Sequence, residues 1–112
     1  MKNLKVSYLL DFYGNLFNQK QREILEMYFQ EDMSLSEIAS VFDMTRQGVY
    51  DNIKRGEKEI LSLEGKLNLM DTFYEISKFL DVIDSNLESG KVLTEEKYEK
   101  IKESLLKIKD II

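Results

Sequence analysis

Residues 34–60, SLSEIASVFDMTRQGVYDNIKRGEKEI, decide the fold of this chain. Ser34 and Glu37 have the spacing of a capping box, in which the hydroxyl serves a free backbone amide and the carboxylate reaches back. Three apolar residues then recur at helical spacing: Ile38, Ala39 and Phe42. The stretch therefore predicts a short helix that begins near Ser34 and has one apolar side.

A turn and a second helix follow directly. Asp43 tolerates a left-handed backbone better than most non-glycine residues, and Thr45 is a favoured N-cap. The inward face of the second helix is marked by four residues on one line: Val49, Ile53, Gly56 and Ile60. This pattern is typical of a helix-turn-helix, whose second helix lies in the major groove of DNA.

The opposite face of the second helix holds the candidate nucleic-acid-binding residues. They are Arg46, Gln47, Tyr50, Lys54, Arg55 and Lys58, with Asp51 among them. Arg and Gln read guanine and adenine edges, and Lys positions phosphates. Residues 45–58 hold four basic and two acidic side chains, so the simpler interpretation of solvated charges on an amphipathic helix stays open.

Residues 19–61 resemble the fourth conserved region of sigma-70-type transcription factors. The matching residues are Gln21-Arg22, Glu37-Ile38-Ala39, Thr45, Val49, Ile53 and Lys54-Arg55-Gly56. That resemblance implies a module that contacts promoter DNA. The sequence departs from the pattern at Asp43, where Gly is usual, and at Asp51 and Asn52.

The full chain is similar to a narrower group, the YlxM-type bacterial proteins, whose opening residues are similar to Tyr8–Phe17. Members of that group are small and all-helical, and gene neighbourhood associates them with the signal recognition particle pathway. The resemblance implies a regulatory protein linked to that pathway, whose partner is DNA or the particle's protein or RNA.

The composition is typical of an ordinary small α-helical protein. The chain has 112 residues, 33% of them charged, with 5 Gly and no Pro to interrupt helices. Its net charge of −5 is opposite to the basic footprint of most DNA-binding domains. If Lys54, Arg55, Lys58 and Arg22 contact phosphates, the log–log salt slope of binding is about −3 to −4.

The sequence lacks the residues that several kinds of catalytic and metal-binding site require. The sequence has no Cys and no His, so thiol nucleophiles, imidazole bases and the usual zinc sites are excluded, and no Gly-rich phosphate loop occurs. We therefore expect that the protein is not an enzyme and has no catalytic residue, no cofactor and no metal site. No apolar run approaches the ~20 residues that span a bilayer, so we expect a cytoplasmic protein without a membrane partner.

The N-terminal residues predict two helices that pack over the helix-turn-helix. The first covers 4–13, with a buried stripe of Leu9, Phe12, Tyr13 and Leu16, and Gly14-Asn15 marks its end. Asn18 and Gln21 form the next capping box, and this helix runs to about Gln30. Its apolar face holds Ile24, Leu25, Tyr28 and Phe29.

The C-terminal part predicts an antiparallel helical hairpin. One heptad stripe comprises Leu69, Phe73, Ile76, Leu80, Ile83 and Leu87, and Ser89-Gly90 ends it; after an N-cap at Thr94, a second comprises Tyr98, Ile101, Leu105, Ile108 and Ile112. Residues 63–66 give the best boundary. We expect a helix-turn-helix domain over 1–64 and a hairpin for packing or dimerisation over 65–112.

Two stripes that face each other leave apolar surface uncovered. The chain's own N-terminal helices, a second copy in a homodimer, or another protein can bury the remainder. Two functions follow. One is a regulatory DNA-binding protein; the alternative is an adaptor for signal recognition particle components that reuses the same fold without sequence-specific DNA binding.

Overall fold

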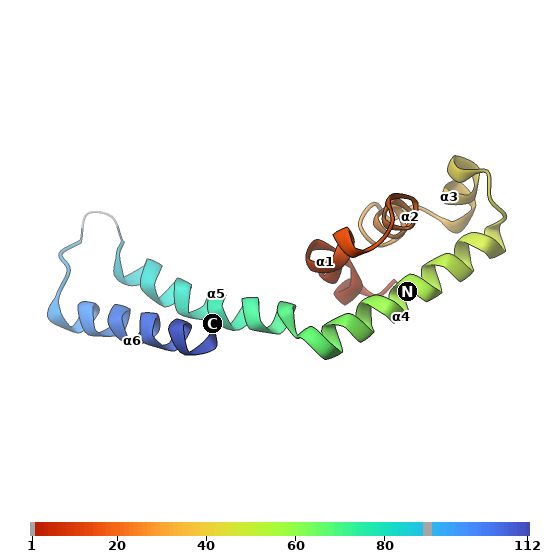
Figure 1. The fold of residues 1–112 in the computed structure, drawn as a ribbon. Helices are drawn as coiled ribbons and strands as arrows, with labels where there is room; N and C mark the ends of the chain where they lie inside the picture. The colour runs from red at the N-terminus through yellow and green to blue at the C-terminus, as the bar shows by residue number, and fades with distance from the viewer. Residues whose placement is uncertain (1, 89–90) are drawn as a thin grey trace. The chain divides into compact units, whose positions relative to one another are not determined.

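The computed structural model describes residues 2–88 and 91–112, and this part of the chain is all-α, as predicted. It divides into two compact units, the first ending at Asn68 and the second covering Leu69–Ile112. The first unit holds α1 (Leu4–Tyr13), a 3-10 turn η1 (Gly14–Leu16), α2 (Gln19–Phe29), α3 (Leu35–Phe42) and α4 (Arg46–Leu67); the second holds α5 (Leu69–Asn86) and α6 (Glu95–Ile111) (Figure 1).

Helix α4 is the centre of the first unit, because it packs against α1, α2 and α3 (Figure 1). Its side chains Val49, Ile53 and Ile60 are buried. The other helices supply the rest of this core: Val6, Leu9, Leu10, Tyr13, Ile24, Leu25, Phe29, Ile38 and Ala39. One face of a 22-residue helix, about 33 Å long, is thus covered by three shorter helices.

Helices α4 and α2 approach each other closely at Gly56. A Cβ atom built on Gly56 would lie 2.7 Å from Leu25 Cδ2 and 2.8 Å from Cδ1. No real Cβ tolerates those distances without a shift of its neighbours. Glycine at position 56 therefore sets how near the two helices come.

One predicted core residue is wrong. Leu16 is 63% exposed, whereas Phe17, one position later, is 9% exposed. The reason is the 3-10 turn after α1, which closes at three residues per turn and so breaks the register that carries Leu9 and Tyr13 inward. Phe12 is half-buried and belongs to the edge of the stripe.

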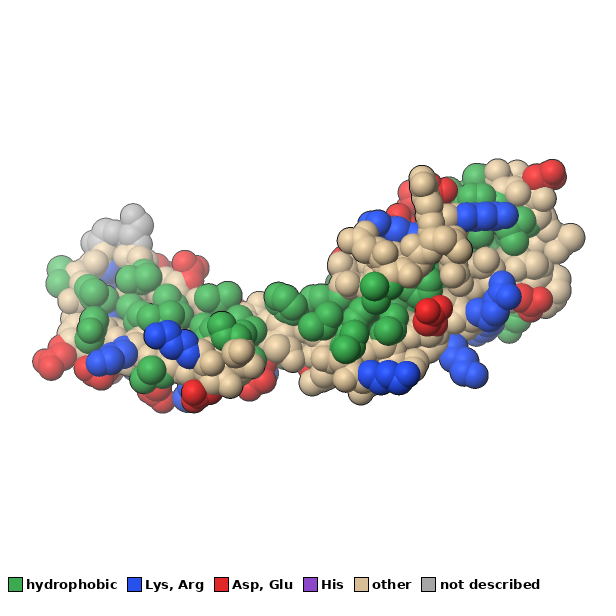
Figure 2. All heavy atoms as spheres, in the orientation of Figure 1, with side chains coloured by type: hydrophobic (Ala, Val, Ile, Leu, Met, Phe, Trp, Pro, Cys, Tyr) green, Lys and Arg blue, Asp and Glu red, His purple; other side chains and the backbone are tan. Residues whose placement is uncertain are grey.

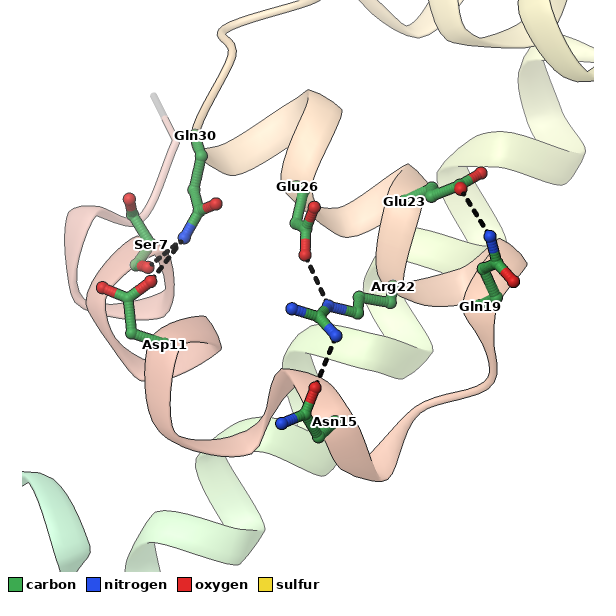
Figure 3. Close-up of polar contacts among 8 residues, drawn as sticks. All are labelled: Ser7, Asp11, Asn15, Gln19, Arg22, Glu23, Glu26 and Gln30. Atoms are coloured by element: carbon green, nitrogen blue, oxygen red, sulfur yellow. Dashed lines mark hydrogen bonds and ion pairs between the residues drawn. The ribbon is translucent and has the colours of Figure 1, made fainter.

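Polar contacts fasten α2 and the loop after it to the N-terminal residues. Gln30 Nε2 donates to the Ser7 carbonyl at 2.9 Å and to Asp11 Oδ1 at 3.3 Å (Figure 3). Lys2 Nζ donates to the Met33 carbonyl at 2.8 Å. The C-terminal end of α2 and the loop after it are thereby held against the N-terminal residues. At the start of α2, Asn18 Oδ1 accepts from the Gln21 amide, which is one of the two bonds of the predicted capping box.

Helix α4 continues through residues 63–66, where the sequence places the domain boundary. The buried Glu64 Oε1 accepts a hydrogen bond of 2.6 Å from the Tyr13 hydroxyl, which ties this part of α4 to α1. The helix ends where Asn68 adopts a left-handed backbone with φ of 54°. The compact unit accordingly ends at Asn68.

In the second unit α5 and α6 pack against each other as the predicted antiparallel hairpin. Thr94 Oγ1 accepts from the Lys97 amide at 3.2 Å, and Glu95 and Glu96 occupy the first turn of α6. The predicted end of the first heptad stripe, Ser89-Gly90, lies outside the described residues. Among the described side chains of these helices only Ser104 is buried, so both apolar stripes keep exposed surface.

No helix in residues 2–88 and 91–112 combines the length and the apolar character needed to cross a membrane.

We predict that Gly56→Ala lowers the free energy of unfolding by about 1–3 kcal/mol, because the added methyl group collides with Leu25 in a packed core. The matched control is Gly65→Ala, where an added Cβ has no neighbour within 4 Å. Alanine at 65 is expected to raise stability by about 0.5–1 kcal/mol through helix propensity. Urea unfolding followed by circular dichroism measures both, and equal effects of the two substitutions would contradict the packing described.

Candidate nucleic-acid interface

The first helix of the candidate interface is fixed by the capping box that the sequence predicts. Ser34 Oγ accepts from the Glu37 amide at 3.1 Å, and Glu37 Oε1 accepts from the Ser34 amide at 3.1 Å. The hydrogen bonds from the Ser34 backbone and then from its side chain lower the pKa of the Glu37 carboxyl below its usual 4.5. These local bonds set where α3 begins.

The turn after α3 has the predicted geometry, although Asp43 stands where related modules use glycine. Asp43 takes a left-handed backbone with φ of 51°, and the Met44 amide donates to the Ala39 carbonyl at 2.9 Å. Thr45 Oγ1 then accepts from the Gly48 amide at 2.9 Å. The chain thus reverses between Ala39 and Thr45, and the Thr45 cap satisfies the Gly48 amide in the first turn of α4.

This turn fixes which side of α4 reaches solvent. Val49 is fully buried and Ile53 is 2% exposed, while Gln47 and Lys54 lie on the exposed side. The structure therefore confirms the predicted orientation of the second helix. We call its exposed side the outward face, which comprises Arg46, Gln47, Tyr50, Asp51, Lys54, Arg55 and Lys58.

Three of the predicted binding residues gather on the side of α4 next to α3. Arg46, Gln47 and Tyr50 line a shallow hollow of about 440 Å³ together with Leu35 of α3. Leu35 was not among the predicted residues, because only the crossing of the two helices brings it there. The hollow offers a guanidinium, an amide and a phenol hydroxyl beside an apolar wall.

Asp51 is a hydrogen-bond partner within the outward face. Gln47 Nε2 donates to Asp51 Oδ1 at 3.0 Å, one helical turn away. The bond holds the Gln47 amide in one orientation and leaves its carbonyl oxygen and second N–H available. Asp51 therefore orders the side chain of Gln47, one of the predicted binding residues, as well as adding negative charge.

Lys54 lies among weak partners. Its ammonium is 5.6 Å from the centre of the Tyr50 ring and 3.8 Å from Glu57 Oε2. Exposed pairs of this kind contribute little to stability, about 0–1 kcal/mol. Lys54 can therefore leave them for a stronger anion at small cost.

The remaining cations of the outward face have no acidic partner in the described part of the chain. Arg46, Arg55 and Lys58 are exposed, and no carboxylate of residues 2–88 or 91–112 lies within 4.0 Å of them. Figure 2 shows Lys and Arg side chains spaced along the side of the first unit on which α4 runs. These charges are available to an external anion.

Arg22, included above among the phosphate contacts, is engaged elsewhere. Its Nε donates to Glu26 Oε1 at 2.6 Å and its Nη1 donates to Asn15 Oδ1 (Figure 3). The guanidinium thus joins α2 to the turn η1 that follows α1. We therefore assign Arg22 to the packing of the first unit and leave it out of the interface.

The part of the chain that the structure describes holds no group of three or more acidic, His or Cys side chains that could bind a metal ion.

These features define a helix-turn-helix protein, in which α3 and the turn present α4. Comparison with known proteins makes the assignment specific: residues 1–110 match the family model described as "Putative helix-turn-helix protein, YlxM / p13 like". The chain belongs to this family, UPF0122.

Individual relatives cover most of the chain. A UPF0122 protein of Oceanobacillus iheyensis is 41% identical over 110 residues, which are 98% of this chain and 96% of the relative. One from Halalkalibacterium halodurans is 47% identical over 79 residues, 70% of this chain and 72% of the relative. One from Bacillus mycoides is 41% identical over 95 residues, 85% and 86% of the two chains.

We predict that Ser34→Ala raises the pKa of Glu37 toward its usual value, because both hydrogen bonds of the capping box depend on Ser34 adopting the N-cap geometry. Side-chain carboxyl titration by NMR measures this. Since the pKa of Glu37 is lowered in the folded state, its contribution to stability is present at neutral pH and is lost as the pH falls below about 4.5. A Glu37 pKa unchanged by the substitution would contradict the box.

Proposed function

We propose that this chain is a regulatory protein that binds duplex DNA through the outward face of α4. The observation that carries the proposal is the position of four cations, Arg46, Lys54, Arg55 and Lys58, on the exposed side of the second helix of a helix-turn-helix. A scaffold of three helices holds that face rigidly. Rigid presentation lowers the entropy that binding costs.

The dimensions and chemistry of the face suit a major groove. A helix with its side chains is about 10–12 Å across, and the groove is about 12 Å wide. Arg46 and Gln47, in the first turn of α4, are placed to read base edges, since recognition helices contact bases with their N-terminal residues. Tyr50, Lys54, Arg55 and Lys58 follow along the face, where hydroxyl and cationic groups bind phosphates.

Binding of this kind depends on a local group of cations in a chain whose total charge is unfavourable for binding DNA. The chain carries −5 overall, so its long-range field opposes approach to DNA. With Arg22 engaged in packing, the phosphate contacts from lysine and arginine are those of Lys54, Arg55 and Lys58, and three such contacts give a log–log salt slope of about −2.7. We therefore expect binding that is strong only at low ionic strength.

The hairpin suggests a homodimer that would present two such faces. Leu80, Leu105 and Tyr98 of the heptad stripes are 51%, 47% and 52% exposed. Figure 2 shows hydrophobic side chains gathered on the visible face of α5 and α6. The hairpin of a second copy has the same apolar stripes, so the two hairpins can bury each other's stripes. A dimer would read two half-sites about one DNA turn, 34–36 Å, apart.

An adaptor for signal recognition particle components in the cytoplasm is the alternative, and the net charge of −5 together with Asp51 at the middle of the outward face favours it. In that case duplex DNA would not bind at low salt. The chain would instead co-elute with the particle's protein or RNA at micromolar concentration.

We predict that Lys54→Glu with Arg55→Glu weakens duplex binding at least tenfold, because two phosphate contacts become two repulsions. Fluorescence anisotropy with a labelled duplex at low salt measures the affinity. The control is Lys102→Glu with Lys109→Glu, which makes the same change of charge on exposed positions of α6. If both double variants bind alike, the outward face does not contact DNA.

We predict that the chain sediments at equilibrium with twice its monomer mass of 13.2 kDa. Leu80→Glu should shift it toward the monomer by placing a charge in the paired stripes. Val92→Glu, at a position that is 81% exposed outside the helices, should not. A wild-type chain that stays monomeric at all concentrations would leave the hairpin as packing within one chain.

A further inference from the structure

Two neighbouring hollows run along the side of α4 that faces α2. The first, about 410 Å³, is lined by Asn18, Lys20, Gln21, Asn52, Arg55 and Glu59. The second, about 380 Å³, is lined by Arg55, Lys58, Glu59, Ser62, Leu63 and Lys66. Because Arg55 and Glu59 line both, the two hollows form one trough, which begins at the start of α2 and follows α4 toward its end.

The trough gathers positive charge in an acidic chain. Four cations, Lys20, Arg55, Lys58 and Lys66, line it against one carboxylate, Glu59. None of the four cations forms an ion pair with a residue in the ranges 2–88 and 91–112. The packing of α2 on α4 thus brings like charges from two helices together without an internal partner, in a protein whose total charge is −5.

The spacing of these cations fits an extended anion. Arg55 and Lys66 are eleven residues apart on one helix, which places them about three turns and 16 Å apart on nearly the same side. A small anion cannot reach both. One strand of duplex DNA carries a phosphate about every 3.4 Å along the axis, so about 16 Å follows four or five phosphates.

We propose that this trough is a binding site for the backbone phosphates of one DNA strand, with Lys20 and Lys66 as contacts beyond the outward face of α4. The proposal rests on the proposed function, because a helix that fills the groove turns its two flanks toward the two strands. On the α2 side the strand meets Lys20, Arg55 and Lys66. These residues position the duplex and carry no base preference.

Glu59 would repel an anion bound in the same trough, so its substitution tests the proposal independently of the lysine variants. Its carboxylate lines both hollows one turn after Arg55. Glu59→Gln removes the repulsion and keeps the shape of the side chain. Duplex affinity should therefore rise, by about threefold or more at low salt, if phosphates lie in the trough.

The deciding experiment compares full-length Lys20→Gln/Lys66→Gln with wild type by fluorescence anisotropy on one duplex from 50 to 200 mM salt. Loss of two phosphate contacts makes the log–log slope shallower by about 1.8, so the loss of affinity over this range shrinks about tenfold. Preference among different duplexes should not change. The matched control, Lys102→Gln/Lys109→Gln, removes the same charge from α6 and should keep the wild-type slope.

A wild-type slope in the Lys20→Gln/Lys66→Gln variant, or an equal change in the control, overturns the trough. If Lys54→Glu/Arg55→Glu still weakens binding at least tenfold in that case, the proposed function stands without the trough. Failure of the wild-type chain to bind any duplex at 50 mM salt overturns both. A Glu59→Gln variant that binds no more tightly than wild type also counts against the trough.

Discussion

Burial of one face of α4 against three other helices is the constraint on which the first unit depends. Val49, Ile53 and Ile60 occupy the core, and Gly56 lets α4 approach Leu25 of α2 within ordinary contact. Since this face is buried, the side chains on the opposite side of the helix are exposed to solvent. The same packing that stabilises the unit therefore produces the candidate interface, and no separate device is needed to expose it.

The charge on the exposed side of α4 is opposite in sign to the total charge of the chain. The total charge of −5 would repel a polyanion, yet Arg46, Arg55 and Lys58 lie on α4 without acidic partners in the described chain. Arg22, by contrast, is neutralised by Glu26 and holds the turn after α1. The functional proposal depends on this contrast between Arg22, which is engaged in packing, and the cations of α4, of which Lys54 has only a weak pair with Glu57.

Sequence predicts well what local bonds decide and poorly what tertiary packing decides. The capping box at Ser34, the left-handed Asp43 and the Thr45 cap all depend on residues within four positions, and each is confirmed. Leu16 is wrong because a 3-10 turn changed the register. Lys20 and Leu35 reach the candidate site only through helix crossings, which one sequence does not reveal. Lys66 could have been found by extending α4 beyond Gly65.

An NMR titration of the isotope-labelled full-length chain with a short duplex at low salt tests the central claim most directly. The account predicts that the largest amide shifts fall within residues 46–58, with smaller ones near Lys20 and Lys66. Shifts confined to α5 and α6, with α4 unperturbed at saturating duplex, would contradict it.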